Sequence, residues 1–103
     1  MNKAKAKGLR DASWSVGDAK DFLRLTAAEA AIVEMRASLA ANLRRLRTAR
    51  RLSQAALAEL IGSSQSRVAK MEAGDPSVSL ELLIRSLLAT GARKREIAQL
   101  IVA

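Results

Sequence analysis

Residues 53–74, SQAALAELIGSSQSRVAKMEAG, contain two short helical patterns separated by a tight turn. Ser53 is a suitable N-cap for a helix over Gln54–Ile61, and Gly62 suits the positive φ that ends such a helix. A second helix is predicted over Gln65–Glu72. This stretch decides the fold, because each of its helices has its own start or stop signal.

The turn between these two helices is predicted at Ser63-Ser64, with Ser64 capping the second helix. Two helices that cross steeply need a small residue at the crossing, and Ala58 is placed there. Four apolar positions are expected to hold the pair together: Leu57, Ile61, Val68 and Met71. The pattern therefore predicts a helix-turn-helix.

On a helical wheel of the second helix, Val68 and Met71 share one side, and the opposite arc is polar. Such an arc fits a major groove, where Gln65 can form paired hydrogen bonds to adenine and Lys70 can donate to guanine. Ser66 and Arg67 belong to the same arc, although an ordinary solvated position explains either of them as well. Gln54 and Ser63 begin a helix and a turn, and are expected to face phosphates.

The charge pattern supports a polyanionic partner. The chain carries 18 Lys and Arg against 10 Asp and Glu, a formal charge of +8. Residues 53–74 are balanced, with two groups of each sign, whereas residues 26–52 carry six basic and two acidic groups. We expect flanking cations, Arg50 and Arg51 among them, to bind phosphates while the neutral helix reads bases.

Upstream, Thr26-Ala27-Ala28-Glu29 has the form of a capping box that opens a helix to about Ala49. A turn at residues 15–18 and a short helix near Ala19–Leu23 are expected before it. One apolar stripe follows the long helix: Ile32, Met35, Leu39, Leu43 and Leu46. Downstream, Ser79 caps a helix to about Ala89, and a last helix covers about Ala92–Val102.

Residues 39–74 resemble the Cro/repressor-type helix-turn-helix of the XRE family, and the later helices are similar in size and order to its closing helices. The resemblance implies a compact, all-α, lambda-repressor-like domain of five to six helices over residues 26–103, with residues 1–25 as a basic tail and helical extension. It also implies base contacts from Ser64, Gln65, Ser66 and Lys70, a phosphate contact from Gln54, and a structural ion pair between Arg47 and Glu72.

Two regions are expected to hold partner surfaces. The extension contains Trp14 and Phe22, which either pack on the long helix or form an arm that binds another protein. In the C-terminal third, the apolar residues that either finish the core or form a dimer surface are Leu82, Ile97, Leu100 and Ile101. A two-fold dimer would place two reading helices about 34 Å apart on a palindromic operator.

The leading hypothesis is a sequence-specific transcriptional regulator of double-stranded DNA, acting as a dimeric repressor in the cytoplasm at the nucleoid. The alternative is an antitoxin similar to HigA-like type II antitoxins, which neutralises a RelE/HigB-like toxin and represses its own operon. No enzyme activity, cofactor or metal site is expected, because the chain has no Cys or His and no nucleophile–base pair. No apolar run reaches the ~20 residues of a membrane span.

Overall fold

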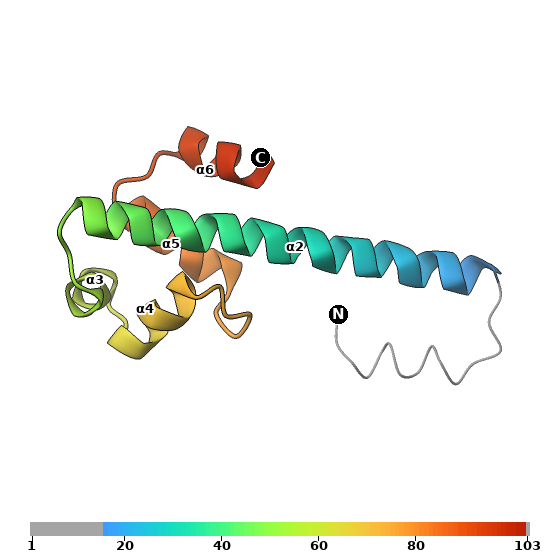
Figure 1. The fold of residues 1–103 in the computed structure, drawn as a ribbon, viewed down its shortest axis with the longest axis horizontal. Helices are drawn as coiled ribbons and strands as arrows, with labels where there is room; N and C mark the ends of the chain where they lie inside the picture. Colours follow the sequence, from blue (N-terminus) through green and yellow to red (C-terminus); the bar gives the residue numbers. More distant parts are fainter. Residues whose placement is uncertain (1–15, 103) are drawn as a thin grey trace. The chain divides into compact units, whose positions relative to one another are not determined.

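The computed structural model describes residues 16–102 and the side chains of residues 21–102. These residues form five helices and no strand, which confirms the all-α prediction: α2 (Val16–Ala49), α3 (Gln54–Ile61), α4 (Gln65–Glu72), α5 (Leu80–Ala89) and α6 (Lys94–Val102). The chain forms two units, residues 1–32 and residues 33–103. Figure 1 shows the order of the helices along the chain.

In the first unit, the described residues are all helical and belong to α2. The predicted capping box at Thr26 is wrong, because α2 begins at Val16 and continues through this position without a break. The hydroxyl of Thr26 donates to the carbonyl of Phe22, 3.0 Å away, and so has a partner within the same helix. Thr in a helix can bond the carbonyl four residues back, and the surrounding Lys, Leu and Ala residues favour helix.

The separate short helix predicted near Ala19–Leu23 is part of α2 for the same reason. The predicted boundary between residues 25 and 26 therefore lies inside a continuous helix. Trp14 lies outside the described residues. Phe22 is half-buried, whereas Leu23 is 65% exposed.

The second unit has an aliphatic core to which every one of its helices contributes. The fully buried apolar side chains are Leu39 and Leu43 of α2, Leu57 of α3, Val68 and Met71 of α4, and Leu83 and Leu87 of α5. Of the stripe predicted on α2, Leu39 and Leu43 are buried and Leu46 packs partly against the core, but Ile32 is 40% exposed. The buried hydroxyls of Ser86 and Thr90 donate to carbonyls one turn back in α5, so neither is unsatisfied.

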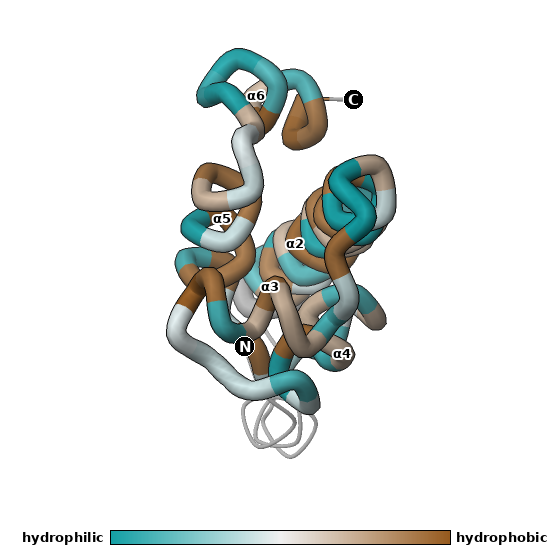
Figure 2. Tube along the Cα trace, turned by 90° about the vertical axis from the view of Figure 1, so that its left-hand side faces the viewer, coloured by the Kyte–Doolittle hydropathy of each residue, from teal (hydrophilic) through white to brown (hydrophobic). Residues whose placement is uncertain are grey.

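Within this unit, α3 and α4 lie on one side and α6 lies on the other, with α5 and the end of α2 between them (Figures 1 and 2). The bounds of α3 and α4 agree with the sequence prediction. No helix in residues 16–102 combines the length and the apolar character that crossing a bilayer requires.

Gly62 makes the turn between α3 and α4. It adopts φ +66°, and its N–H reaches back to carbonyls of Ala58 and Glu59. A Cβ built at this position would meet nothing within 4 Å. Glycine is therefore favoured here by the backbone conformation and not by a lack of space.

We expect Gly62→Ala to lower the free energy of unfolding by about 1 kcal/mol, the usual cost of a left-handed conformation for an L-residue. Gly62→Asn should lose less, because Asn tolerates this region of backbone space. Thermal unfolding of the two variants beside the unaltered protein measures both effects. Equal stability of all three proteins would show that this turn is not held in the left-handed form.

Candidate nucleic-acid interface

Side-chain caps hold the start of each short helix. The Ser53 hydroxyl accepts a hydrogen bond from the Ala56 N–H at 3.0 Å, and the Ser64 hydroxyl accepts one from the Arg67 N–H at 3.2 Å. Each bond satisfies one of the N–H groups that a helix start leaves free. The first turns of α3 and α4 are therefore each stabilised by a serine cap.

The two sides of α4 differ sharply. Val68 and Met71 are fully buried, and they anchor the helix on the core. Four polar residues of α4 are exposed on the remaining surface: Gln65, Ser66, Arg67 and Lys70. The only acidic residue of α4 is Glu72, whose side chain is just 4% exposed. The exposed side of α4 thus carries hydrogen-bonding groups and cations but no carboxylate.

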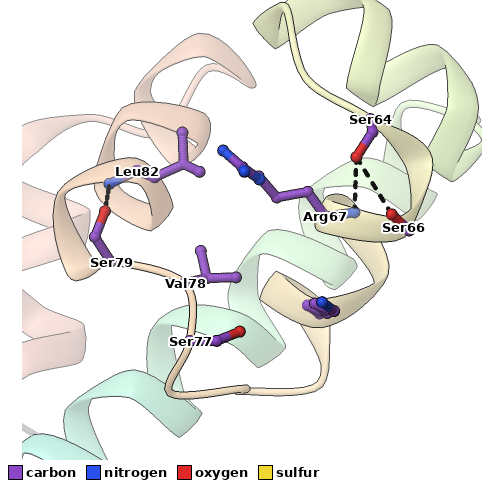
Figure 3. Close-up of a pocket in the computed structure, with 8 residues that line it drawn as sticks. Ser64, Ser66, Arg67, Ser77, Val78, Ser79 and Leu82 are labelled. Atoms are coloured by element: carbon purple, nitrogen blue, oxygen red, sulfur yellow. Dashed lines mark hydrogen bonds between the residues drawn. The ribbon is translucent and has the colours of Figure 1, made fainter.

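A groove of about 480 Å³ runs beside this exposed side. It is lined from α4 and its cap by Ser64, Ser66, Arg67 and Lys70, and from the segment that leads into α5 by Ser77, Val78, Ser79 and Leu82. Figure 3 shows the Arg67 side chain extending across the groove from α4 towards Leu82. Hydroxyls and cations on facing walls can hold a phosphate backbone between them.

The structure brings Arg47 of α2 and Glu72 of α4 together. Arg47 donates to Glu72 through Nε at 2.6 Å and through Nη2 at 3.0 Å, and its Nη1 donates to the Leu52 carbonyl at 2.8 Å. This bidentate hydrogen bond is the main reason why the pKa of Arg47 is raised above its ordinary value; burial opposes the shift, and the charge of Glu72 adds to it. The pair joins the end of α2 to the end of α4.

A family model described as a helix-turn-helix domain matches residues 38–100. The match includes α3, α4, their turn and the grooved surface, and it covers more than half of the chain. The chain belongs to the helix-turn-helix domain family. Searches of curated proteins and of solved structures gave no match.

In this helix-turn-helix, the residues predicted to contact phosphate do not share one environment. Gln54 is half-buried, and its Nε2 donates to Glu72 Oε1 at 3.2 Å. Ser63 is partly buried in the turn, where its N–H donates to the Ala58 carbonyl at 2.8 Å. Arg51 is exposed and has φ +59°, whereas the guanidinium of Arg50 lies against Gly91, at the end of α5.

The structure also places groups beside the helix-turn-helix that the sequence did not suggest. Arg36 of α2 donates to the Val78 carbonyl, 42 residues away, and so ties the segment between α4 and α5 to α2. Ser77 and Ser79 line the groove opposite α4. The Asp75-Pro76-Ser77 sequence is a turn signal, and Ser79 was predicted as the cap of the next helix, but neither indicates that this segment lies opposite α4.

In that segment, the Asp75 carboxylate accepts a hydrogen bond from the Ser77 N–H at 2.8 Å. The hydrogen bonds from Ser77 lower the pKa of Asp75, and the nearby charges of Lys70 and Arg36 lower it further. A carboxyl group whose pKa is lower in the folded state stabilises that state above its unfolded pKa. This contribution is lost as the pH falls through the lowered value.

We therefore expect an NMR titration of the Asp75 carboxyl to have its midpoint below the ordinary Asp value of about 3.9. Ser77→Pro removes the donating N–H and should move the midpoint upward. An unchanged midpoint in that variant would show that the bond from Ser77 is not the cause of the shift.

The predicted C-terminal partner surface needs correction. Ile97 is only 6% exposed and belongs to the core, and Leu82 and Leu100 pack partly against it. These three residues finish the core of the helix-turn-helix domain, Leu82 from α5 and Ile97 and Leu100 from α6. Ile101 is 40% exposed, and the other large apolar side chains exposed on α5 and α6 are Leu88 and Val102.

Proposed function

We propose that this protein is a sequence-specific DNA-binding transcriptional regulator, a dimeric repressor of the Cro/repressor type. The observation that carries the proposal is the exposed side of α4, which combines Gln65, Ser66, Arg67 and Lys70 while its only carboxylate is buried in an ion pair. A helix with this surface can enter the major groove, where an exposed acid or a bulky aliphatic side chain would be unfavourable.

The proposed contacts follow from where each side chain lies. Gln65 is at the start of α4 and is free to form two hydrogen bonds to adenine, while Lys70 donates to guanine. The Ser64 hydroxyl already accepts the capping bond from the Arg67 N–H, and its proposed contact with a base is made in addition to that bond. Arg67, which spans the groove towards Leu82, is placed to bind either a base or a phosphate.

Phosphate binding is assigned to groups around α4. Gln54 and Ser63 keep the role expected from their positions, and Arg51 supplies an exposed cation after α2. Arg44 is a further candidate, because it is exposed and lines a hollow of about 270 Å³ together with Gln54 and Ala73. These contacts provide affinity that is independent of sequence.

Dimerisation is proposed through α5 and α6. Leu88, Ile101 and Val102 are the exposed apolar side chains there, at 45%, 40% and 83% exposure. Burial of such side chains between two copies is favourable, and a two-fold dimer suits a palindromic operator. Sedimentation of the protein over a concentration series tests this, with Val102→Glu expected to shift the equilibrium towards monomer.

The DNA-binding proposal is tested by fluorescence anisotropy on a short labelled duplex over a range of salt concentrations. Arg67→Ala and Arg51→Ala should each weaken binding, and each phosphate contact that is lost should reduce the slope of log K against log salt by roughly 0.9. Arg85→Ala is the matched control, because Arg85 is exposed on α5 and pairs with Glu81. Identical slopes of log K against log salt for the unaltered protein and all three variants would contradict the proposed binding surface.

A second candidate function is that of an antitoxin in a type II pair, similar to HigA-like antitoxins. It is favoured by the continuation of α2 to Val16, because this helical extension carries Leu23 at 65% exposure. An exposed leucine on such a helix is suited to contact another protein, for which a RelE/HigB-like toxin is the proposed partner. Co-purification with the product of a neighbouring gene, lost in Leu23→Asp, would support it; purification without any partner would count against it.

A further inference from the structure

Three consecutive cations, Arg93, Lys94 and Arg95, stand at the start of α6, and all three are exposed. A fourth cation, Arg50, lies against the turn that precedes them. A Cβ built at Gly91 would lie 2.1 Å from Nη2 of Arg50. The Arg50 guanidinium therefore lies directly on the backbone of the turn between α5 and α6, two residues before Arg93.

These four cations, here called the α6 basic surface (Arg50, Arg93, Lys94 and Arg95), are not neutralised by ion pairs. Within residues 21–102, none of their four side chains forms an ion pair or a hydrogen bond, whereas the side chains of Arg47 and Arg85 pair with carboxylates and those of Arg36 and Arg45 donate to oxygens. The nearest carboxylate in sequence is Glu96, which accepts the Arg93 backbone N–H at 2.9 Å. The surface therefore keeps a net positive charge.

The three cations at the start of α6 lie away from the reading helix. In both Figure 1 and Figure 2, α6 and α4 are at opposite ends of the second unit, with α5 between them. A duplex that lies along the exposed side of α4 faces the other end of the unit. Cations beside α6 are thus in place for a different anionic ligand.

We propose that the α6 basic surface binds the phosphate backbone of a second DNA segment, so that one protein joins two duplexes. Three of its four cations are arginines, whose planar guanidinium matches phosphate oxygens in a bidentate way. All four of its members are charged and exposed, whereas the core of a protein interface is depleted of charged residues. Binding of this kind is independent of base sequence and weakens with salt.

Binding of the first duplex by α4 rests on the proposed function, whereas binding of the second duplex does not. The test immobilises a duplex containing the preferred site, adds the protein, and measures the retention of a fluorescent duplex of unrelated sequence. The variant Arg93→Ser/Lys94→Ser/Arg95→Ser should retain the second duplex roughly tenfold less well, because up to three phosphate contacts are lost. Its affinity for the immobilised site should stay within about twofold, since α4 is unaltered. Arg85→Ser is the control and should behave like the unaltered protein.

Three results would overturn the proposal. One is that the unaltered protein retains no second duplex. Another is that the triple variant retains the second duplex as well as the unaltered protein does, which would assign binding of that duplex to the other α4 of a dimer. Binding of poly-L-glutamate without retention of a second duplex would instead identify an acidic protein as the partner. If sequence-specific binding by α4 fails, unrelated DNA should still bind through the α6 basic surface and be lost in the triple variant, so the two failures are distinguishable.

Discussion

Glu72→Ala is expected to lower the free energy of unfolding by about 3 kcal/mol, the largest effect of any single exchange of a charged residue in this domain. The Glu72 side chain is 4% exposed and that of Arg47 is 13% exposed. Removing the carboxylate leaves the Arg47 guanidinium with the Leu52 carbonyl alone, and it also takes away the acceptor of Gln54. An unpaired charge at a buried position is the reason for the large loss.

Chemical denaturation measures this effect, and the chain provides a matched control. Glu81 forms the corresponding ion pair with Arg85 at 3.3 Å, but both side chains are more than two-thirds exposed. Glu81→Ala should therefore change stability by less than about 1 kcal/mol. The double variant Arg47→Leu/Glu72→Leu should recover much of the loss, because it removes both buried charges. A loss for Glu72→Ala no larger than for Glu81→Ala would contradict the role assigned to this pair.

Gln65→Ala and Lys70→Ala are expected to weaken binding to the preferred DNA site by about 1–3 kcal/mol each, and to relax the preference at the base pair that each contacts. Both side chains are exposed, so the melting temperature of the free protein should change little. Gln99→Ala on α6 is the control for an exposed glutamine away from α4, and it should bind like the unaltered protein.

The measurement is a titration of each variant with the preferred site and with a set of sites altered one base pair at a time. A loss that is equal on every sequence would assign Gln65 and Lys70 to phosphate instead of bases. An unchanged affinity would remove them from the interface.

The helices α3 and α4 could be predicted to their end residues because the signals are local. Ser53 and Ser64 cap the helix starts, and Gly62 provides the left-handed turn, so neighbouring residues alone determine these positions. The same rule failed at Thr26, since a Thr hydroxyl serves equally well as an N-cap or as a donor to the carbonyl one turn back. The helical propensity of the residues before it decided between the two.

Contacts between residues far apart in the chain could not be predicted from the sequence. The periodicity of α6 shows that it has an apolar side, but not whether that side faces its own core or another copy. The sequence therefore left both environments open for Ile97, which the structure places in the core. The bond from Arg36 to the Val78 carbonyl joins residues 42 apart and leaves no pattern in the sequence. The polar side of α4 was visible from the sequence, because burial of Val68 and Met71 fixes which residues remain exposed.

The central claim is that the exposed side of α4 reads a DNA sequence. Selection of bound DNA from a random pool, at one stated salt concentration, tests it most directly. We predict enrichment of a palindrome whose half-sites are centred one helical turn, about 34 Å, apart, and loss of that enrichment in Gln65→Ala/Lys70→Ala. A pool that binds without enrichment of any sequence, or the same enriched sequence from the double variant, would contradict the claim.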